Sequence, residues 1–296
     1  MISNGKFYES QFEEATIELL REAHWQYAFG DDIHRKYTDP LIEEDLRNFL
    51  TVQYKDKNLT TSEMDSIVAN LRNTGGQNDY YALRNAFLLY RDGYDFAYSD
   101  GRDNPFRLEY IDFEHPDHNI FRCVNQFVME QGRENRRPDI LLFINGIPVC
   151  IIELKNPTKQ NATIHDAHTQ ICTRYMRDIP ALLKYCALAV ISDGAKNALG
   201  TTYTPFEFFY EWKKIENEDK AGKGLDTLRT LIRGALSPER ILEILRDYVY
   251  FPDPTKEDDT TEIVCRYPQF FATRKLRDHI LNHLRSVGGD GKGGTY

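Results

Sequence analysis

The chain has 296 residues, of which 41% are hydrophobic and 28% are charged, so it is long enough to bury one large core or two smaller ones. Its 37 lysines and arginines stand against 46 aspartates and glutamates, and the net charge of −9 excludes a general polyanion-binding surface. No run comes near the roughly 18 consecutive apolar residues of a membrane-spanning helix, and the first residues lack a signal-peptide core. The sequence therefore predicts a cytoplasmic chain with no membrane segment.

Cysteines and histidines give no clear metal signal. The five cysteines are an odd number without a C-x-x-C pair, which argues against a disulfide framework and a thiolate zinc site. Two histidine pairs, His165 with His168 and His279 with His283, lack a third ligand at a usual spacing and are interpreted as solvated helix residues. The glycine-rich stretch around Lys292 fails the phosphate-loop template, so no nucleotide-binding residue is predicted.

The first third of the chain has the pattern of a helical region that gives way to strands. Residues 9–29 carry apolar residues at helical spacing, with Ser10 as the expected N-cap and Glu13 completing a capping box. Three further helices are predicted over residues 40–50, 62–71 and 80–91, the second of them with Ser62 as its N-cap. Two strands are then predicted over residues 107–113 and 119–129.

The strongest local signal lies in the middle of the chain. Residues 139–144 and 147–154 are apolar runs on either side of Asn145-Gly146, which is typical of a β-hairpin. Because both faces are apolar, this hairpin is expected at the centre of a covered sheet. A helix should follow over residues 162–178, a buried strand over 186–192, an aromatic segment over 205–214 and a loop over 217–224. Two more helices are expected, one from residue 237 onward and one over 268–286.

These elements predict an α/β protein with a mixed central sheet flanked by helices, a helix-rich N-terminal part and a short C-terminal extension. Three charged residues, Asp139, Glu153 and Lys155, stand at the open end of the apolar hairpin. Charges are rarely placed there without partners, because burying an ion is costly. Two carboxylates and a lysine form a hard oxygen site for Mg²⁺, which lowers the pKa of a bound water. The alternative is a structural ion pair at the strand end.

The hairpin register decides whether the two carboxylates meet. A two-residue loop pairs residue 144 with 147 and 139 with 152, which leaves Asp139 and Glu153 on opposite faces. One extra residue, such as a bulge at Gly146, brings 139 opposite 153, and Pro148 favours an irregularity because it cannot donate to the ladder. We therefore expect Asp139 and Glu153 to converge through a bulge, or through a bend at Asp139.

The motif Pro138-Asp139 … Glu153-Leu154-Lys155 resembles the PD-(D/E)xK nuclease motif. The longer run from Arg137 to Pro157 resembles the N-terminal nuclease domain of the R (motor and cleavage) subunit of type I restriction enzymes, and the likeness spans most of residues 9–296. Further pieces follow in the order that this family shows: Asn125-Gln126-Phe127, Gln170, Tyr175, Asp178-Ile179-Pro180, Ile191-Ser192-Asp193-Gly194, Gly200-Thr201 and Trp212-Lys213.

The resemblance implies a double-strand DNA endonuclease domain in which Asp139 and Glu153 bind Mg²⁺ and Lys155 is the catalytic lysine. It also implies an acidic residue on the first helix, for which Glu13 is the candidate, although a capping or solvated role for Glu13 is the alternative.

Gln170 and Tyr175 would support the site and contact DNA. On an α-helix their spacing of five leaves them about 140° apart, whereas Gln170 and Arg174 share a face better.

Basic residues around the motif are candidates to line a phosphate-binding groove or to form a salt-bridged rim: Arg133, Arg136, Arg137, Lys155, Lys159, Arg174 and Arg177.

The expected organisation is an endonuclease domain over residues 1–235, a helix and charged linker over 236–260, and the beginning of the first motor domain over 261–296. The resemblance implies that ATP binding and translocation belong to a longer protein, and that methylation and specificity subunits are its partners. Two other functions stay open, a catalytically silent DNA-docking or subunit-interaction module and a repair or single-strand nuclease of the same fold.

Overall fold

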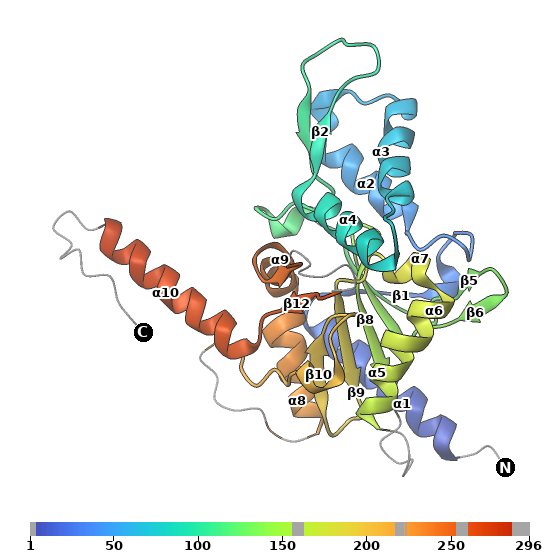
Figure 1. Ribbon diagram of the computed structural model, residues 1–296, viewed down its shortest axis with the longest axis vertical. Coiled ribbons are helices and arrows are strands. Elements are labelled where there is room, and N and C mark those ends of the chain that lie inside the picture. Colours follow the sequence, from blue (N-terminus) through green and yellow to red (C-terminus); the bar gives the residue numbers. More distant parts are fainter. Residues whose placement is uncertain (1–3, 156–162, 217–221, 223, 253–259, 286–296) are drawn as a thin grey trace.

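The computed structural model describes residues 4–155, 163–216, 222, 224–252 and 260–285 (Figure 1). Its centre is a six-stranded mixed sheet, in which β1 is parallel to β4, β8 is parallel to β9, and the other neighbours are antiparallel. The strand order is β1 (Gln26–Phe29), β4 (Phe121–Asn125), β7 (Ile140–Ile144), β8 (Ile147–Leu154), β9 (Leu188–Ser192) and β10 (Asn197–Gly200). The predicted mixed sheet and its central apolar hairpin are confirmed.

Helices cover both faces of the sheet, and the side chains of β7 divide between them. Leu142 and its neighbours two residues away on β7 join the core beneath α1 (Asn4–Glu22), α8 (Leu225–Leu231) and α9 (Pro238–Asp247). Leu141 and Phe143 join the second core. That core lies beneath the elements α5 (Ile164–Thr169), the π-helical segment Gln170–Tyr175, α6 (Met176–Asp178) and α7 (Pro180–Leu183). All residues of β7, β8 and β9 are buried, which explains their continuous apolar sequences.

The helix-rich N-terminal part stands above the sheet in Figure 1 and shares its first core. It comprises α2 (Glu43–Gln53), α3 (Thr61–Asn73), α4 (Asp79–Asp92) and the hairpin of β2 (Tyr94–Phe96) with β3 (Phe106–Leu108). The N-cap expected at Ser62 is wrong by two residues. Thr60 caps α3 instead, in a capping box with Glu63, because the Glu63 carboxylate lies three residues after Thr60 and reaches its backbone N–H.

The helix predicted over residues 9–29 is wrong at both ends. It begins at Asn4, so Ser10 lies inside it and the expected capping box with Glu13 does not form. It ends at Glu22, and His24 then adopts a φ of 71°, which turns the chain into β1. Trp25 is buried there against Phe121, and β1 pairs with β4, so tertiary contacts override the helical pattern.

The C-terminal elements are β11 (Val249–Tyr250), β12 (Ile263–Val264) and α10 (Tyr267–Arg285), which extends away from the body in Figure 1. Val249 and Phe270 are buried in the same core as the sheet. The segments on either side of the predicted domain boundaries at 235/236 and 260/261 therefore share one core, and those boundaries stay predictions. A short hairpin of β5 (Met129–Gln131) and β6 (Glu134–Arg136) completes the fold. Among the described residues, no helix has the length and apolarity needed to cross a membrane.

The Asn145-Gly146 turn gives a stability prediction with a matched control. Gly146 has a φ of 77°, and a Cβ added there would lie 2.1 Å from the backbone oxygen of Ile42. Gly132 has a similar φ of 62° but no atom within 4 Å of such a Cβ. We expect Gly132→Ala to cost about 1–2 kcal/mol of unfolding free energy through backbone strain alone, and Gly146→Ala on the order of 3–5 kcal/mol. Urea denaturation measures both values, and equal losses would contradict the steric argument.

Candidate functional site

The β7–β8 hairpin brings Asp139 opposite Glu153. Asn145 and Gly146, with φ values of 51° and 77°, form a two-residue turn that pairs Ile144 with Ile147. The register then shifts between Phe143, which pairs with Pro148, and Leu142, which pairs with Cys150. Val149 is therefore the extra residue, and the predicted bulge is present but not at Gly146. Ile140 consequently pairs with Ile152, so the next residues outward, Asp139 and Glu153, face each other.

The two carboxylates influence each other directly. Asp139 is half-buried, and its Oδ2 accepts a hydrogen bond of 2.7 Å from the backbone N–H of Leu154. Glu153 is only 1% exposed. Burial and, second, the negative charge of Asp139 raise the pKa of Glu153 to about 8. The charged form of Glu153 is thus disfavoured at neutral pH, even though the Lys155 ammonium lies beside it.

Lys155 joins this pair, and we call Asp139, Glu153 and Lys155 the edge cluster. The Nζ atom of Lys155 donates to Oε1 of Glu153 and to Oε1 of Gln170, each at 2.8 Å. Gln170 Nε2 in turn donates to the Tyr175 hydroxyl at 2.7 Å, and that hydroxyl lies 3.3 Å from Oε2 of Glu153. Gln170 and Tyr175 therefore hold the lysine and the buried carboxylate in a closed ring of hydrogen bonds.

A local change of helix type explains how Gln170 reaches Tyr175. Residues Gln170–Tyr175 form a π-helical segment, in which the backbone N–H of Met176 bonds to the oxygen of Ile171, five residues earlier. Residues five apart then lie side by side. Such π-helical turns occur frequently at functional sites. The expected separation of Gln170 and Tyr175 by about 140° is wrong, because it assumed a regular α-helix. Arg174 is exposed.

Glu13 lies at the same edge of the sheet, where its carboxylate is hydrogen-bonded to the end of β4 and does not form the expected capping box. Its Oε1 accepts hydrogen bonds from Asn125 Nδ2 at 2.6 Å and from Gln126 Nε2 at 3.0 Å. Asn125 pairs with Ile140, next to Asp139, so α1 delivers a third carboxylate to the end of β4. The sequence interpretation gave Asn125 and Gln126 no role. The signal was two consecutive amide side chains at the end of a buried strand.

The basic residues around the motif divide into two groups. Arg136 and Arg177 both form ion pairs with the buried Asp178, at 2.7 Å and 2.6 Å, which fits the salt-bridged rim. Arg133, Arg137 and Arg174 are exposed and stay candidates for phosphate contacts. The Arg137 backbone oxygen lies 3.5 Å from the Tyr175 hydroxyl. Lys159 lies outside the described residues.

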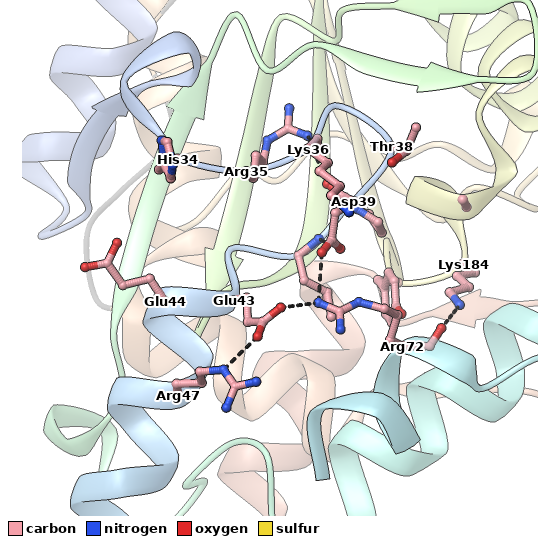
Figure 2. A pocket seen from close by; sticks show the side chains of 14 residues that line it. His34, Arg35, Lys36, Thr38, Asp39, Glu43, Glu44, Arg47, Arg72 and Lys184 are labelled. Carbon is pink, nitrogen blue, oxygen red and sulfur yellow. Dashed lines mark hydrogen bonds and ion pairs between the residues drawn. The ribbon is translucent and has the colours of Figure 1, made fainter. Parts of the chain in front are cut away.

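A cavity of about 880 Å³ lies apart from the edge cluster, between α2, α3 and α7 (Figure 2). Several of its cations are already engaged: Arg72 contacts Asp39 at 2.8 Å and Glu43 at 2.5 Å, and Arg47 contacts Glu43 at 2.6 Å. Lys184 donates to the backbone oxygen of Arg72 at 2.8 Å. These pairs stabilise the junction of the helical part with the sheet and do not indicate a phosphate site.

All five cysteines are free thiols, as the sequence predicts.

By its fold and site, this is an α/β protein that gathers carboxylates and a lysine at one edge of a mixed sheet. Residues 6–208 match the family model described as "Type I restriction enzyme R protein N terminus", and the chain belongs to this family. The family resemblance drawn from the sequence motifs is confirmed.

Curated relatives agree with this assignment. The chain is 28% identical over 285 residues to the HindI type I restriction enzyme endonuclease subunit of Haemophilus influenzae, covering 92% of this chain and 27% of that protein. It is 27% identical over 296 residues to the putative MjaIXP endonuclease subunit of Methanocaldococcus jannaschii, covering 92% and 28%. The chain therefore spans little more than a quarter of the length of these relatives.

Proposed function

We propose that this chain is the Mg²⁺-dependent endonuclease domain of a type I restriction enzyme R subunit, and that it hydrolyses phosphodiester bonds of double-stranded DNA. The observation that carries the proposal is the buried Glu153 carboxylate, which faces Asp139 and is hydrogen-bonded to Lys155. Membership of the family and the printed names of the relatives, which are endonuclease subunits, support it. ATP-driven translocation and assembly with methylation and specificity subunits are parts of the same proposal and concern the longer protein.

The donor set of the edge cluster fits a hard divalent cation. Asp139 and Glu153 offer carboxylate oxygens, which Mg²⁺ prefers, and their mutual repulsion is relieved by a cation between them. When bound, the ion supplies an activated water and screens charge on the phosphate. Glu13 is proposed to complete the acidic site, because its carboxylate is held by Asn125 and Gln126 at the same edge of the sheet.

Lys155 is proposed to bind the phosphate or the attacking water. Its side chain is mostly buried but keeps 15% of its surface exposed, so part of it reaches solvent. Gln170 accepts one of its N–H groups and Glu153 another, which leaves a third donor to face the reacting phosphate. The lysine is thereby oriented before DNA binds, and this orientation reduces the entropy lost on reaching the transition state.

Tyr175 and Gln170 are positioning residues, and this leads to a testable difference. Removing the Tyr175 hydroxyl with Tyr175→Phe frees Glu153 and Gln170 from the hydrogen-bonded ring without changing the packing of the aromatic ring. We expect cleavage to fall by about 10–100-fold, the usual effect of losing a partner that orients a metal ligand. DNA cleavage by the complete enzyme measures this, with Thr173→Ala, an exposed neighbour on the same segment, as the control. Equal activities of the two variants would contradict the role of Tyr175.

A further inference from the structure

A second cluster of possible ligands lies at the other end of the sheet from Asp139 and Glu153. The loop between β3 and β4 is fixed to the hairpin turn, because Asn119 Oδ1 accepts from Asn145 Nδ2 at 2.8 Å and Ile120 N donates to Asn145 Oδ1 at 2.7 Å. The turn and the edge cluster are at opposite ends of β7 and β8. Whatever this loop binds is therefore separate from the proposed nuclease site.

Two imidazoles converge there on one buried carboxylate. Oδ2 of Asp112 lies 3.3 Å from Nδ1 of His115 and 2.9 Å from Nδ1 of His118. One ligand atom from each of the three residues lies within 4.8 Å of the others, and the two rings are stacked with centroids 4.8 Å apart. The 3₁₀ turn Pro116–His118 creates this arrangement, since residues three apart in such a turn lie over one another.

Five nitrogen atoms crowd around the Asp112 carboxylate, three of them hydrogen-bond donors and two of them imidazole Nδ1 atoms. Oδ1 accepts from the backbone N–H groups of Glu114 at 3.0 Å and His115 at 2.9 Å. Oδ2 faces both imidazoles and also Gln53 Nε2 at 3.1 Å. These five groups compete for about four lone-pair sites. A single cation between Oδ2 and the two Nδ1 atoms removes this excess and explains why both rings turn the same nitrogen toward one oxygen.

We propose that Asp112, His115 and His118 bind one divalent transition-metal ion of the zinc class. Two neutral imidazoles and one carboxylate are the ligands that such ions prefer, whereas Mg²⁺ prefers oxygen alone. Metal–ligand bonds of about 2.0–2.1 Å in a tetrahedron place the ligand atoms about 3.3 Å apart. The separation of 3.3 Å between Asp112 and His115 equals this value, and the 2.9 Å to His118 is somewhat shorter. The imidazole side chains are 65% and 51% exposed, so the fourth position opens to water.

The surroundings of the cluster favour a cation and give it a structural effect. Glu114 and Asp117 lie in the same loop, and both are exposed. Gln53 of α2 donates to the ligating oxygen of Asp112, and Arg246 of α9 contacts Glu114 at 3.2 Å. An ion bound to this loop therefore stabilises its junction with α2 and α9. The sequence interpretation missed this site because the D-x-x-H-x-x-H spacing of residues 112–118 falls in a loop, not in a predicted helix.

The test is a Co²⁺ titration of tag-free protein followed by visible absorption, with Zn²⁺ competition and calorimetry. We expect one equivalent of Co²⁺ to give four-coordinate spectral bands that Zn²⁺ abolishes, and Zn²⁺ to raise the unfolding temperature. The double variant His115→Ala/His118→Ala is expected to bind more than about 100-fold more weakly, because even the loss of an outer partner costs about 10–100-fold.

Two matched variants separate this site from other causes. His24→Asn removes an exposed histidine of the α1–β1 turn and should leave Co²⁺ binding unchanged. Asp139→Asn/Glu153→Gln removes the proposed Mg²⁺ ligands and should leave the four-coordinate Co²⁺ bands unchanged, because an all-oxygen site does not give them. Failure of the nuclease proposal therefore does not affect this readout. Circular dichroism verifies that each variant is folded. Absence of micromolar Co²⁺ and Zn²⁺ binding in the unaltered protein, or equal binding by the double histidine variant, would overturn the proposal.

Discussion

Lys155→Ala in the complete enzyme is expected to lower the rate of double-strand DNA cleavage by at least about 100-fold, the cost typical of losing one group that stabilises transition-state charge. Asp139→Asn and Glu153→Gln should reduce cleavage at least as strongly, because they also weaken the binding of the divalent cation. The physical reason is that the three side chains meet at one sheet edge, where Lys155 is held by Glu153 and Gln170 at 2.8 Å.

The measurement is conversion of plasmid DNA by the full-length subunit assembled with its partners, in the presence of ATP and Mg²⁺. Lys55→Ala, which removes an exposed lysine far from the edge cluster in sequence, is the matched control and should retain full activity. DNA binding should survive in Lys155→Ala. Cleavage that persists in Asp139→Asn and Lys155→Ala would contradict the catalytic role of these residues. It would favour the alternative that this chain is a catalytically silent DNA-docking or subunit-interaction module.

Cation binding at the edge cluster is expected to depend steeply on pH. The pKa of Glu153 is raised to about 8, first by burial and then by Asp139. Below that pH the carboxyl group holds a proton that the cation must displace, so affinity should rise about tenfold per pH unit and level off above about 8. Isothermal titration with Mn²⁺ in two buffers of different ionisation enthalpy measures both the affinity and the proton released.

Two variants give this prediction its controls. Glu153→Gln should bind Mn²⁺ weakly and lose the pH dependence, whereas Glu14→Gln, an exposed neighbour of Glu13 on α1, should behave as the unaltered chain. Affinity that stays constant between about pH 6 and 8 in the unaltered chain would refute the role of Glu153 as the titrating ligand.

The same raised pKa has a consequence for stability in the absence of metal. A carboxyl group whose pKa rises from 4.5 in the unfolded chain to about 8 in the folded one stabilises the fold below the first value, and the stabilisation is lost as pH rises to the second. Glu153→Gln should therefore raise the unfolding temperature at alkaline pH while it abolishes cleavage. Such an exchange of stability for activity is typical of a buried functional charge.

Several elements could be predicted from the sequence because their signals are local. The apolar runs on both sides of Asn145-Gly146 predicted the β7–β8 hairpin, and the three charges at its open end predicted that Asp139, Glu153 and Lys155 come together. The continuous apolar character of these strands also predicted their central position in a covered sheet. Local hydrogen-bonding preferences and side-chain period suffice for these inferences.

Other features depended on contacts between distant residues. The end of α1 and the start of β1 were missed, since Trp25 is buried by packing against Phe121, almost a hundred positions further along. The site of the bulge was also missed, because a bulge at Gly146 and one at Val149 give the same alignment of Asp139 with Glu153. Only the packing of the complete sheet chooses between them.

The sequence by itself determined the class of fold, the family and the chemical types gathered at the edge of the sheet. It could do so because apolar period, turn residues and motif order are properties of the chain alone. Only the tertiary structure decided the π-helical pairing of Gln170 with Tyr175, the third carboxylate from Glu13, and the meeting of two imidazoles at Asp112. Each of these depends on the direction in which a side chain points, which is set by the packing of elements around it.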